Sequence, residues 1–273
     1  YYTKPGITNN EVYVKAMTQA GIPFIDFNSY FLNAKDTSKY LLYPQTGIHW
    51  SKYGMVLVAD SIASYISQLL GENIPEIRTD SIELTKKFRD ADGDIEEGMN
   101  LIFSINKKVL AYPYMHFVKE GRRQPKVLAV ADSYYWGIFN MGVPVNIFND
   151  SRYWFYNHEV YPDTYKSPTF VADFDFLEQI NKQNIVLLMA TEATMDRFPW
   201  GFDTQFLNSV NNPNYIDKDA SRRIKEIEDY IRKTPDWFDK IVEKAKFKNI
   251  SVDSMIRIDA RYLYREEQKK LVK

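Results

Sequence analysis

Cysteine is absent from this chain of 273 residues, which excludes disulfide bonds, zinc–thiolate sites, iron–sulfur clusters and thiol nucleophiles. A large charge of one sign is absent as well, since 35 Lys and Arg residues are balanced by 36 Asp and Glu residues. This balance argues against a nucleic-acid binder, which carries an excess of basic residues. With a hydrophobic share of 45%, the chain can build one large α/β domain, or a smaller domain with an appendage.

The motifs of several cofactor-dependent enzyme classes are also missing. Neither Gly-x-x-x-x-Gly-Lys-Ser/Thr nor Gly-x-Gly-x-x-Gly occurs, so kinases and dinucleotide-dependent dehydrogenases find no support. The histidines His49, His116 and His158 lack the spacing that places two metal ligands on one helix face. We therefore expect neither a metal nor a cofactor.

Long hydrophobic runs are lacking too. No stretch approaches the roughly 20 apolar residues that span a bilayer. The sequence starts at Tyr1 without an initiator methionine or a signal-like leader. We therefore expect it to be a piece of a longer protein, with an N-terminal signal or anchor outside this sequence.

What is present alternates between helix and strand patterns. A capping box at Thr8 and Glu11 predicts a helix that ends at Gly21, and apolar residues at helical spacing predict a second helix that ends at Gly71. The predicted buried strands are 22–27, 126–132 and 184–190, and a short helix is predicted around 174–180. This alternation predicts an α/β fold with a mostly parallel sheet.

The composition changes toward the C-terminus. Residues 218–273 are richer in Lys and Arg than in Asp and Glu, whereas residues 1–217 carry a net negative charge. Helix signals at Thr234-Pro235 and at Ser251 predict two or three helices in this tail. We expect a main domain over 1–217, with a polar excursion over 71–108, and a helical module over 218–273.

Two residues stand where an α/β scaffold presents reactive groups. Ser133 directly follows the predicted strand 126–132, at the carboxyl end where open α/β sheets bind ligands. His49 lies on a loop before a helix, between Gly47 and Gly54. A serine in such a place is a nucleophile if an imidazole removes its proton, and a helix N-cap if none does.

The segments around these two residues resemble motifs of one enzyme superfamily. Val130–Tyr134 (Val-Ala-Asp-Ser-Tyr) resembles the nucleophile block of SGNH hydrolases, and Thr46–Ser51 (Thr-Gly-Ile-His-Trp-Ser) resembles the block that carries their base. The histidine block precedes the serine here, an order similar to that of the circularly permuted alginate O-acetyltransferases of the AlgJ/AlgX type. The resemblance implies an SGNH-like three-layer α/β sandwich over about residues 10–200.

The same resemblance implies an activity. Ser133 would be the nucleophile and His49 its general base, in acetyl transfer to a hydroxyl of an exported or cell-envelope polysaccharide through a serine ester. It implies a polysaccharide or oligosaccharide acceptor, an acyl-donor membrane protein as a further partner, and an extracytoplasmic, periplasmic or cell-envelope, location.

The sequence departs from the family at the triad acid and the oxyanion-hole asparagine. The acid's position, two residues before His49, holds Gly47, and we expect Asp26 or Glu192 to orient the imidazole instead. Residues 191–194 lack the family's Asn block. A carbohydrate acetyl esterase and a catalytically silent glycan-binding or assembly subunit therefore stay open as alternatives. The acidic segment 90–94 lacks the spacing of a calcium loop and is expected to be a solvated loop.

Overall fold

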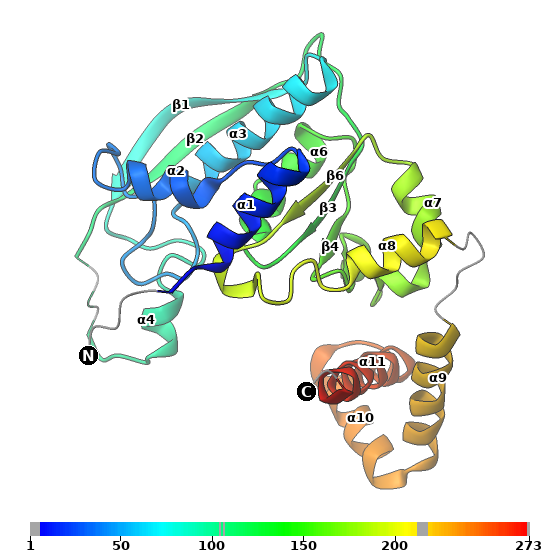
Figure 1. The fold of residues 1–273 in the computed structure, drawn as a ribbon. Helices are drawn as coiled ribbons and strands as arrows, with labels where there is room; N and C mark the ends of the chain where they lie inside the picture. The colour runs from blue at the N-terminus through cyan, green and yellow to red at the C-terminus, as the bar shows by residue number, and fades with distance from the viewer. Residues whose placement is uncertain (1–5, 104, 106, 212–217, 272–273) are drawn as a thin grey trace. The chain divides into compact units, whose positions relative to one another are not determined.

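The computed structural model describes residues 6–271 apart from 104, 106 and 212–217 (Figure 1). The chain forms two compact units, one made of Tyr1–Tyr156 and Lys182–Trp200 and the other of Asn157–Asn181 and Gly201–Lys273. The expected domain boundary after residue 217 lies at the edge of 212–217, outside the described residues. The chain is a mixed α/β protein with a helical C-terminal region.

A parallel group of strands forms the centre of the first unit. β3 (Val127–Ala131) lies between β4 (Tyr153–Phe155) and β6 (Ile185–Met189) and runs parallel to both. Every residue of β3 is buried, as its continuous apolar sequence predicts. The strands predicted over 126–132 and 184–190 are both present, but β6 is only partly buried, contrary to the expectation of a buried strand.

The first unit also has a second sheet. β1 (Glu76–Thr85) and β2 (Leu110–Val118) pair as an antiparallel hairpin, so a mostly parallel sheet is not confirmed for the chain as a whole. β1 lies within residues 71–108, which were expected to be a polar excursion. The two sheets do not establish a three-layer sandwich. β1 is largely exposed, with Ile77 as its one buried residue, and this exposure accounts for its polar sequence.

Helix α3 (Lys52–Leu70) is present and ends at Gly71, as predicted. Ser51 caps its N-terminus by accepting a hydrogen bond from the Gly54 N–H, and Gly71 ends it in the left-handed conformation. α3 contacts β1, β2 and α5 (Tyr135–Asn140), and lies along the hairpin in Figure 1. By length and composition alone α3 could cross a membrane, although it contains no uninterrupted run of about 20 apolar residues. Here it contributes its buried face to the first unit's core.

The N-terminal segment confirms one prediction and corrects another. α1 (Asn9–Ala20) has the predicted capping box and ends at Gly21. The strand predicted over 22–27 is wrong, because α2 (Phe27–Ala34) starts there and Asp26 is its N-cap. The side chain of Asp26 accepts a hydrogen bond from the Ser29 N–H. Aspartate favours this cap position, and that local preference prevails over the apolar pattern of a strand.

Shorter elements complete the first unit. Near its candidate site lie α4 (Asp94–Gly98) and the 3₁₀ turn η3 (Glu192–Thr194), and α6 (Val143–Asn146) follows and contacts α5. α4 contributes no buried residue, whereas α5 buries Tyr135 and Ile138. α4 therefore depends on the contacts of its first residues for its place in the unit.

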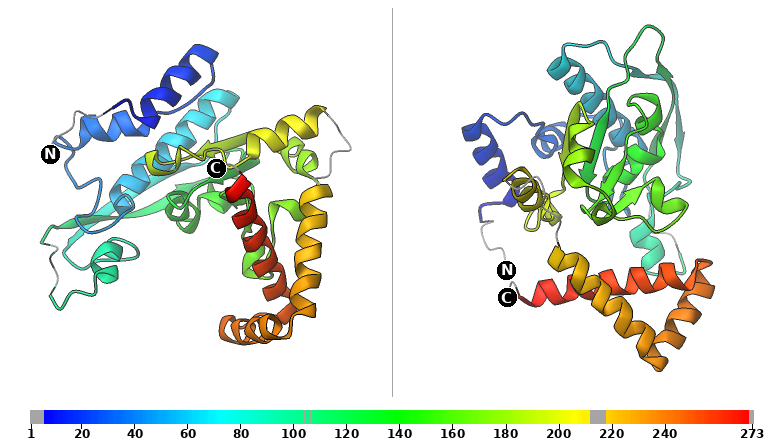
Figure 2. Two further views of the ribbon diagram at one scale, coloured as in Figure 1. Left: turned by 60° about the horizontal axis from the view of Figure 1, so that its bottom comes forward. Right: turned by 90° about the vertical axis from the view of Figure 1, so that its right-hand side faces the viewer.

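The second unit is mainly helical (Figure 2). Its elements are β5 (Glu159–Tyr161), η1 (Asp163–Tyr165), η2 (Val171–Asp173), α7 (Phe176–Asn181), α8 (Phe202–Asn211), α9 (Lys218–Lys233), α10 (Pro235–Lys248) and α11 (Val252–Leu271). α9, α10 and α11 share one apolar core that includes Ile231, Ile241 and Ile256. The helices predicted at Thr234-Pro235 and Ser251 are confirmed.

Candidate functional site

Ser133 lies at the carboxyl end of the central strand. The chain leaves β3 at Ala131, turns at Asp132 and Ser133, and enters α5 at Tyr135. The Tyr135 N–H donates to the Asp132 carbonyl, which closes this turn. Because β3 and the first residue of α5 are buried, the turn is held at both sides while the Ser133 side chain stays partly exposed.

His49 reaches Ser133 from the loop before α3. Its Nε2 lies 3.1 Å from the Ser133 Oγ, within hydrogen-bond distance. The loop is fixed next to the histidine, since Trp50 is buried and the Ser51 N–H donates to the Leu42 carbonyl. The structure thus brings together the two residues that the sequence selected, although they lie far apart in the chain.

A carboxylate that the sequence analysis did not select faces the other nitrogen of His49. The Nδ1 lies 3.6 Å from the Oδ2 of Asp94, the first residue of α4. This distance suits an ion pair but is too long for a hydrogen bond, and in the described residues Nδ1 has no hydrogen-bond partner. The other oxygen of Asp94 accepts a hydrogen bond of 2.9 Å from the Ile48 N–H, which binds the carboxylate to the histidine loop.

Gly47 explains why the acid does not stand two residues before the histidine. A Cβ at Gly47 would lie 2.5 Å from the Pro44 Cγ and 2.9 Å from the carbonyl oxygens of Ala91 and Asp92. Real Cβ atoms essentially never approach other atoms below 3.0 Å. The segment that carries Asp94 therefore fills the space that an aspartate side chain at position 47 would need.

Segment 90–94 was expected to be a solvated loop, and this is wrong for two of its residues. Asp92 is 7% exposed, and Asp94 faces His49. One local signal was present, because an acidic residue after Gly93 is typical of the first turn of a helix. That signal predicts a helix start, but it does not tell which histidine the carboxylate meets.

The two acids that the sequence selected have other partners. Asp26 caps α2 and accepts a hydrogen bond from the Asn10 side chain. Burial raises the pKa of Asp26, but its hydrogen bonds with Ser29 and Asn10 outweigh this and lower the pKa overall. Glu192 accepts a hydrogen bond from the Asn10 N–H. Asp94 therefore takes the place that was expected of Asp26 or Glu192.

Asp132, next to the serine, is buried and fixes the turn. One carboxylate oxygen accepts a hydrogen bond of 3.0 Å from the Tyr134 N–H. The other accepts from the Thr191 N–H and from the hydroxyl groups of Thr191 and Thr194, at 2.7 to 2.8 Å. Through Thr191 and Thr194, the segment after β6 therefore holds the turn that carries Ser133.

Tyr134 joins the serine turn to the histidine loop. Its ring lies 4.8 Å from the His49 ring, and its hydroxyl donates a hydrogen bond to the Ile48 carbonyl. Burial, with smaller effects from Tyr43, Asp132 and Asp94, raises the pKa of Tyr134 to about 12. The hydroxyl is therefore protonated at neutral pH and remains a donor.

Comparisons with solved structures give remote similarities, including those to AlgX and AlgJ. The structure of Pseudomonas aeruginosa AlgX has a TM-score of 0.42 and 15% identity, and the match covers 67% of this chain and 43% of that one. The O-acetyltransferase domain of Pseudomonas putida AlgJ has a TM-score of 0.40 and 14% identity, with 76% and 73% covered. The chain thus spans less than half of AlgX. No protein-family model and no curated protein matches the chain.

The arrangement has the parts of a nucleophilic serine site. Ser133 supplies the hydroxyl, His49 the base, and Asp94 the negative charge on the far side of the ring. In the described part of the chain the Ser133 N–H donates no hydrogen bond, so it can meet an oxyanion, whereas the Tyr134 N–H is used by Asp132. Among the described residues, no group of three His, Asp or Glu side chains is arranged to hold a metal ion.

Proposed function

We propose that the chain is an O-acyltransferase that moves an acetyl group onto a hydroxyl of an exported or cell-envelope polysaccharide through an ester of Ser133. The observation that carries this proposal is the 3.1 Å distance between the His49 Nε2 and the Ser133 Oγ. A base at this distance can take the hydroxyl proton as the oxygen attacks a carbonyl. The position of Asp94 supports it, because a carboxylate on Nδ1 leaves Nε2 free to accept that proton.

In the first half-reaction, the Ser133 Oγ attacks the carbonyl carbon of the acyl donor while His49 Nε2 takes its proton. The tetrahedral intermediate collapses, the bond to the leaving group breaks, and that group takes the proton from His49. In the second half-reaction, a sugar hydroxyl attacks the acetyl ester and gives its proton to His49. The proton then returns to Ser133 as the acetylated sugar leaves.

The choice of a sugar hydroxyl over water rests on the aromatic side chains at the site and on the sequence resemblance. The Tyr134 ring lies 4.8 Å from the His49 ring, and Trp50 packs edge-on against Tyr134. Aromatic rings with a polar tip suit contact with a sugar. The extracytoplasmic location and a membrane protein as acyl donor belong to the same proposal.

Mass spectrometry of the intact protein with p-nitrophenyl acetate, with and without an acetyl-free alginate oligosaccharide, tests this proposal. We expect one acetyl group on the wild type, none on Ser133→Ala, and acetylated oligosaccharide as product. Ser61→Ala is the control, because the Ser61 hydroxyl only donates to a carbonyl within α3. Release of free acetate alone would favour an esterase, and turnover by Ser133→Ala would contradict the proposal.

A further inference from the structure

The segment that carries Asp94 is fastened to the hairpin through one tyrosine. Tyr112, on β2, is 5% exposed, and its hydroxyl donates a hydrogen bond of 2.5 Å to the Asp92 carboxylate. The same hydroxyl accepts a hydrogen bond of 3.1 Å from the Arg89 N–H. One side chain of a regular strand therefore holds the turn between 89 and 92 at both of its ends.

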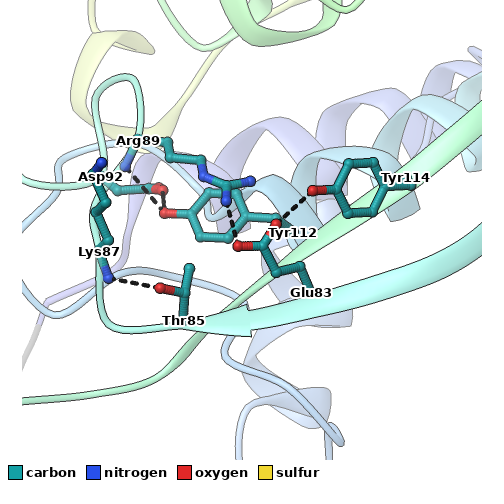
Figure 3. A network of polar contacts seen from close by, with 7 residues as sticks. All are labelled: Glu83, Thr85, Lys87, Arg89, Asp92, Tyr112 and Tyr114. Atoms are coloured by element: carbon teal, nitrogen blue, oxygen red, sulfur yellow. Dashed lines mark hydrogen bonds and ion pairs between the residues drawn. The ribbon is translucent and has the colours of Figure 1, made fainter.

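A wider network holds the ring of Tyr112 in place (Figure 3). The Arg89 guanidinium lies 4.4 Å from the ring centre and pairs with Glu83 on β1. The other oxygen of Glu83 accepts a hydrogen bond from the hydroxyl of Tyr114, which Figure 3 shows on the far side of Tyr112 from Asp92. Tyr114 thus belongs to the same network but donates to Glu83 and not to Asp92, which makes it a control for Tyr112.

From Asp92 the fixed backbone leads directly to the site. The carbonyl of Asp92 packs against Gly47, and two residues further the Asp94 carboxylate faces His49. The Ile95 N–H donates a hydrogen bond of 3.0 Å to the Thr46 carbonyl. Hydrogen bonds to the hairpin on one side and to the histidine loop on the other therefore determine where Asp94 lies.

We propose that Tyr112, acting through Asp92, is a positioning residue that sets the distance between the Asp94 carboxylate and the His49 Nδ1. This inference rests on the proposed acyl transfer, which gives the Asp94–His49 contact its role. The contact is sensitive to position, because at 3.6 Å it has an ion-pair distance without a hydrogen bond. A small shift of the 89–94 turn decides whether Asp94 still orients the ring.

The effect can be measured without turnover, on the resting protein. Nitrogen-15 chemical shifts of the labelled histidines report which ring nitrogen carries the proton, and His49→Gln assigns the signals. A carboxylate near Nδ1 favours the proton on Nδ1. We expect Asp94→Asn and Tyr112→Phe to move the His49 population toward the Nε2 proton, and Tyr114→Phe to leave it unchanged.

Kinetics with p-nitrophenyl acetate supply the second readout. We expect Tyr112→Phe to lower kcat about tenfold and to leave KM nearly unchanged. A tenfold loss corresponds to the free energy that one hydrogen bond contributes. Asp92→Asn keeps an oxygen acceptor for Tyr112 and should retain more activity than Asp92→Ala. If Tyr112 acts through Asp94, the double variant Tyr112→Phe, Asp94→Asn should be no slower than Asp94→Asn alone.

The outcomes separate this inference from the proposed function. An unchanged His49 proton population in folded Tyr112→Phe, or losses that multiply in the double variant, would overturn the positioning role while leaving acyl transfer intact. A shifted population in Tyr112→Phe together with full turnover by Ser133→Ala would leave the positioning role standing and remove the proposed function. Unfolding curves of each variant show that it is folded.

Discussion

The serine edge and the acid segment of the candidate site are built in different ways. Ser133 follows β3, which is buried throughout and paired with strands on both sides. Asp94 starts a helix of 5 residues that buries none of them, after a turn without regular structure. The serine is placed by the core, whereas the acid segment is placed by individual hydrogen bonds. The Tyr112 hydroxyl donates to Asp92, and the N–H groups of Ile95 and Ile48 donate to Thr46 and Asp94.

This difference indicates which residues of the site can be supplied from another part of the chain and which cannot. A residue at the end of a buried strand cannot move without disturbing the packing of the sheet. A carboxylate on a short surface helix can be supplied from another part of the chain, provided that space is left for it. Gly47 leaves that space. Because position 47 has no side chain, the segment that carries Asp94 can pack against it, and Asp94 can face His49.

The largest effect is expected at the base. His49→Gln should lower acetyl transfer by about 10⁴-fold, because the Ser133 hydroxyl then lacks a proton acceptor. His116→Gln is the matched control, since His116 also pairs with a carboxylate, that of Asp80, but on the exposed hairpin. Initial rates with p-nitrophenyl acetate measure both variants. If both variants lose the same fraction of the initial rate, the loss comes from lower protein stability and not from removal of the base at Ser133.

Removing the acid's charge should cost less than removing the base. Asp94→Asn should lower kcat by about 10² to 10³-fold. In a serine protease, where the acid accepts a hydrogen bond from the imidazole, the loss is about 10⁴-fold. We expect a smaller loss here because Asp94 lies 3.6 Å from Nδ1, too far for a hydrogen bond. Asp90→Asn, a change of the same kind in the same turn, should have little effect. If both variants keep wild-type kcat, the acid segment has no part in the chemistry.

Substitutions at Gly47 test whether the histidine loop needs a glycine where the segment that carries Asp94 packs against it. Gly47→Ala should push the Ala91 and Asp92 carbonyls away, and lower both kcat and the free energy of unfolding, the latter by about 1–3 kcal/mol. Gly98→Ala in α4 is the control, because a Cβ there meets no atom within 4 Å. Urea unfolding and kcat are measured on both. Gly47→Asp should also fail to restore Asp94→Asn, and restoration would contradict the steric argument.

The smallest effect is expected at Tyr134, and it depends on pH. Its pKa is raised from 10.0 to about 12 in the folded protein, so the folded state holds this proton more tightly than the unfolded state does. The resulting stability is fully present below pH 10 and is lost as the pH rises toward 12. Between pH 8 and pH 11, urea unfolding should show a larger loss for the wild type than for Tyr134→Phe. An equal loss in both would disprove this role.

Much of the fold follows from local sequence. The helices at 9–20 and 52–70 have their caps and stops within the segment, and the strands 127–131 and 185–189 are continuous apolar runs between polar residues. The strand expected over 22–27 failed because one aspartate prefers a helix N-cap. β1 was missed because a half-exposed strand carries a polar sequence. These errors arise where two local preferences compete.

The sequence likewise predicts some residues of the candidate site and not others. The place of Ser133 after a buried strand and of His49 before a capped helix can be inferred from neighbouring residues. The choice of Asp94 over Asp26 and Glu192 cannot, because all three are carboxylates with ordinary local roles. Their partners are decided by contacts between segments that lie far apart in the chain.

The sequence by itself determined most of the helices and the central strands and selected Ser133 and His49 as candidates, since caps, apolar runs and strand ends act over a few neighbouring positions. Only the tertiary structure decided which carboxylate meets the imidazole and which hairpin residue holds it there. The physical reason is that an ion pair depends on distance in space, and the hydrogen bonds that set this distance join 46 to 95, 48 to 94 and 92 to 112.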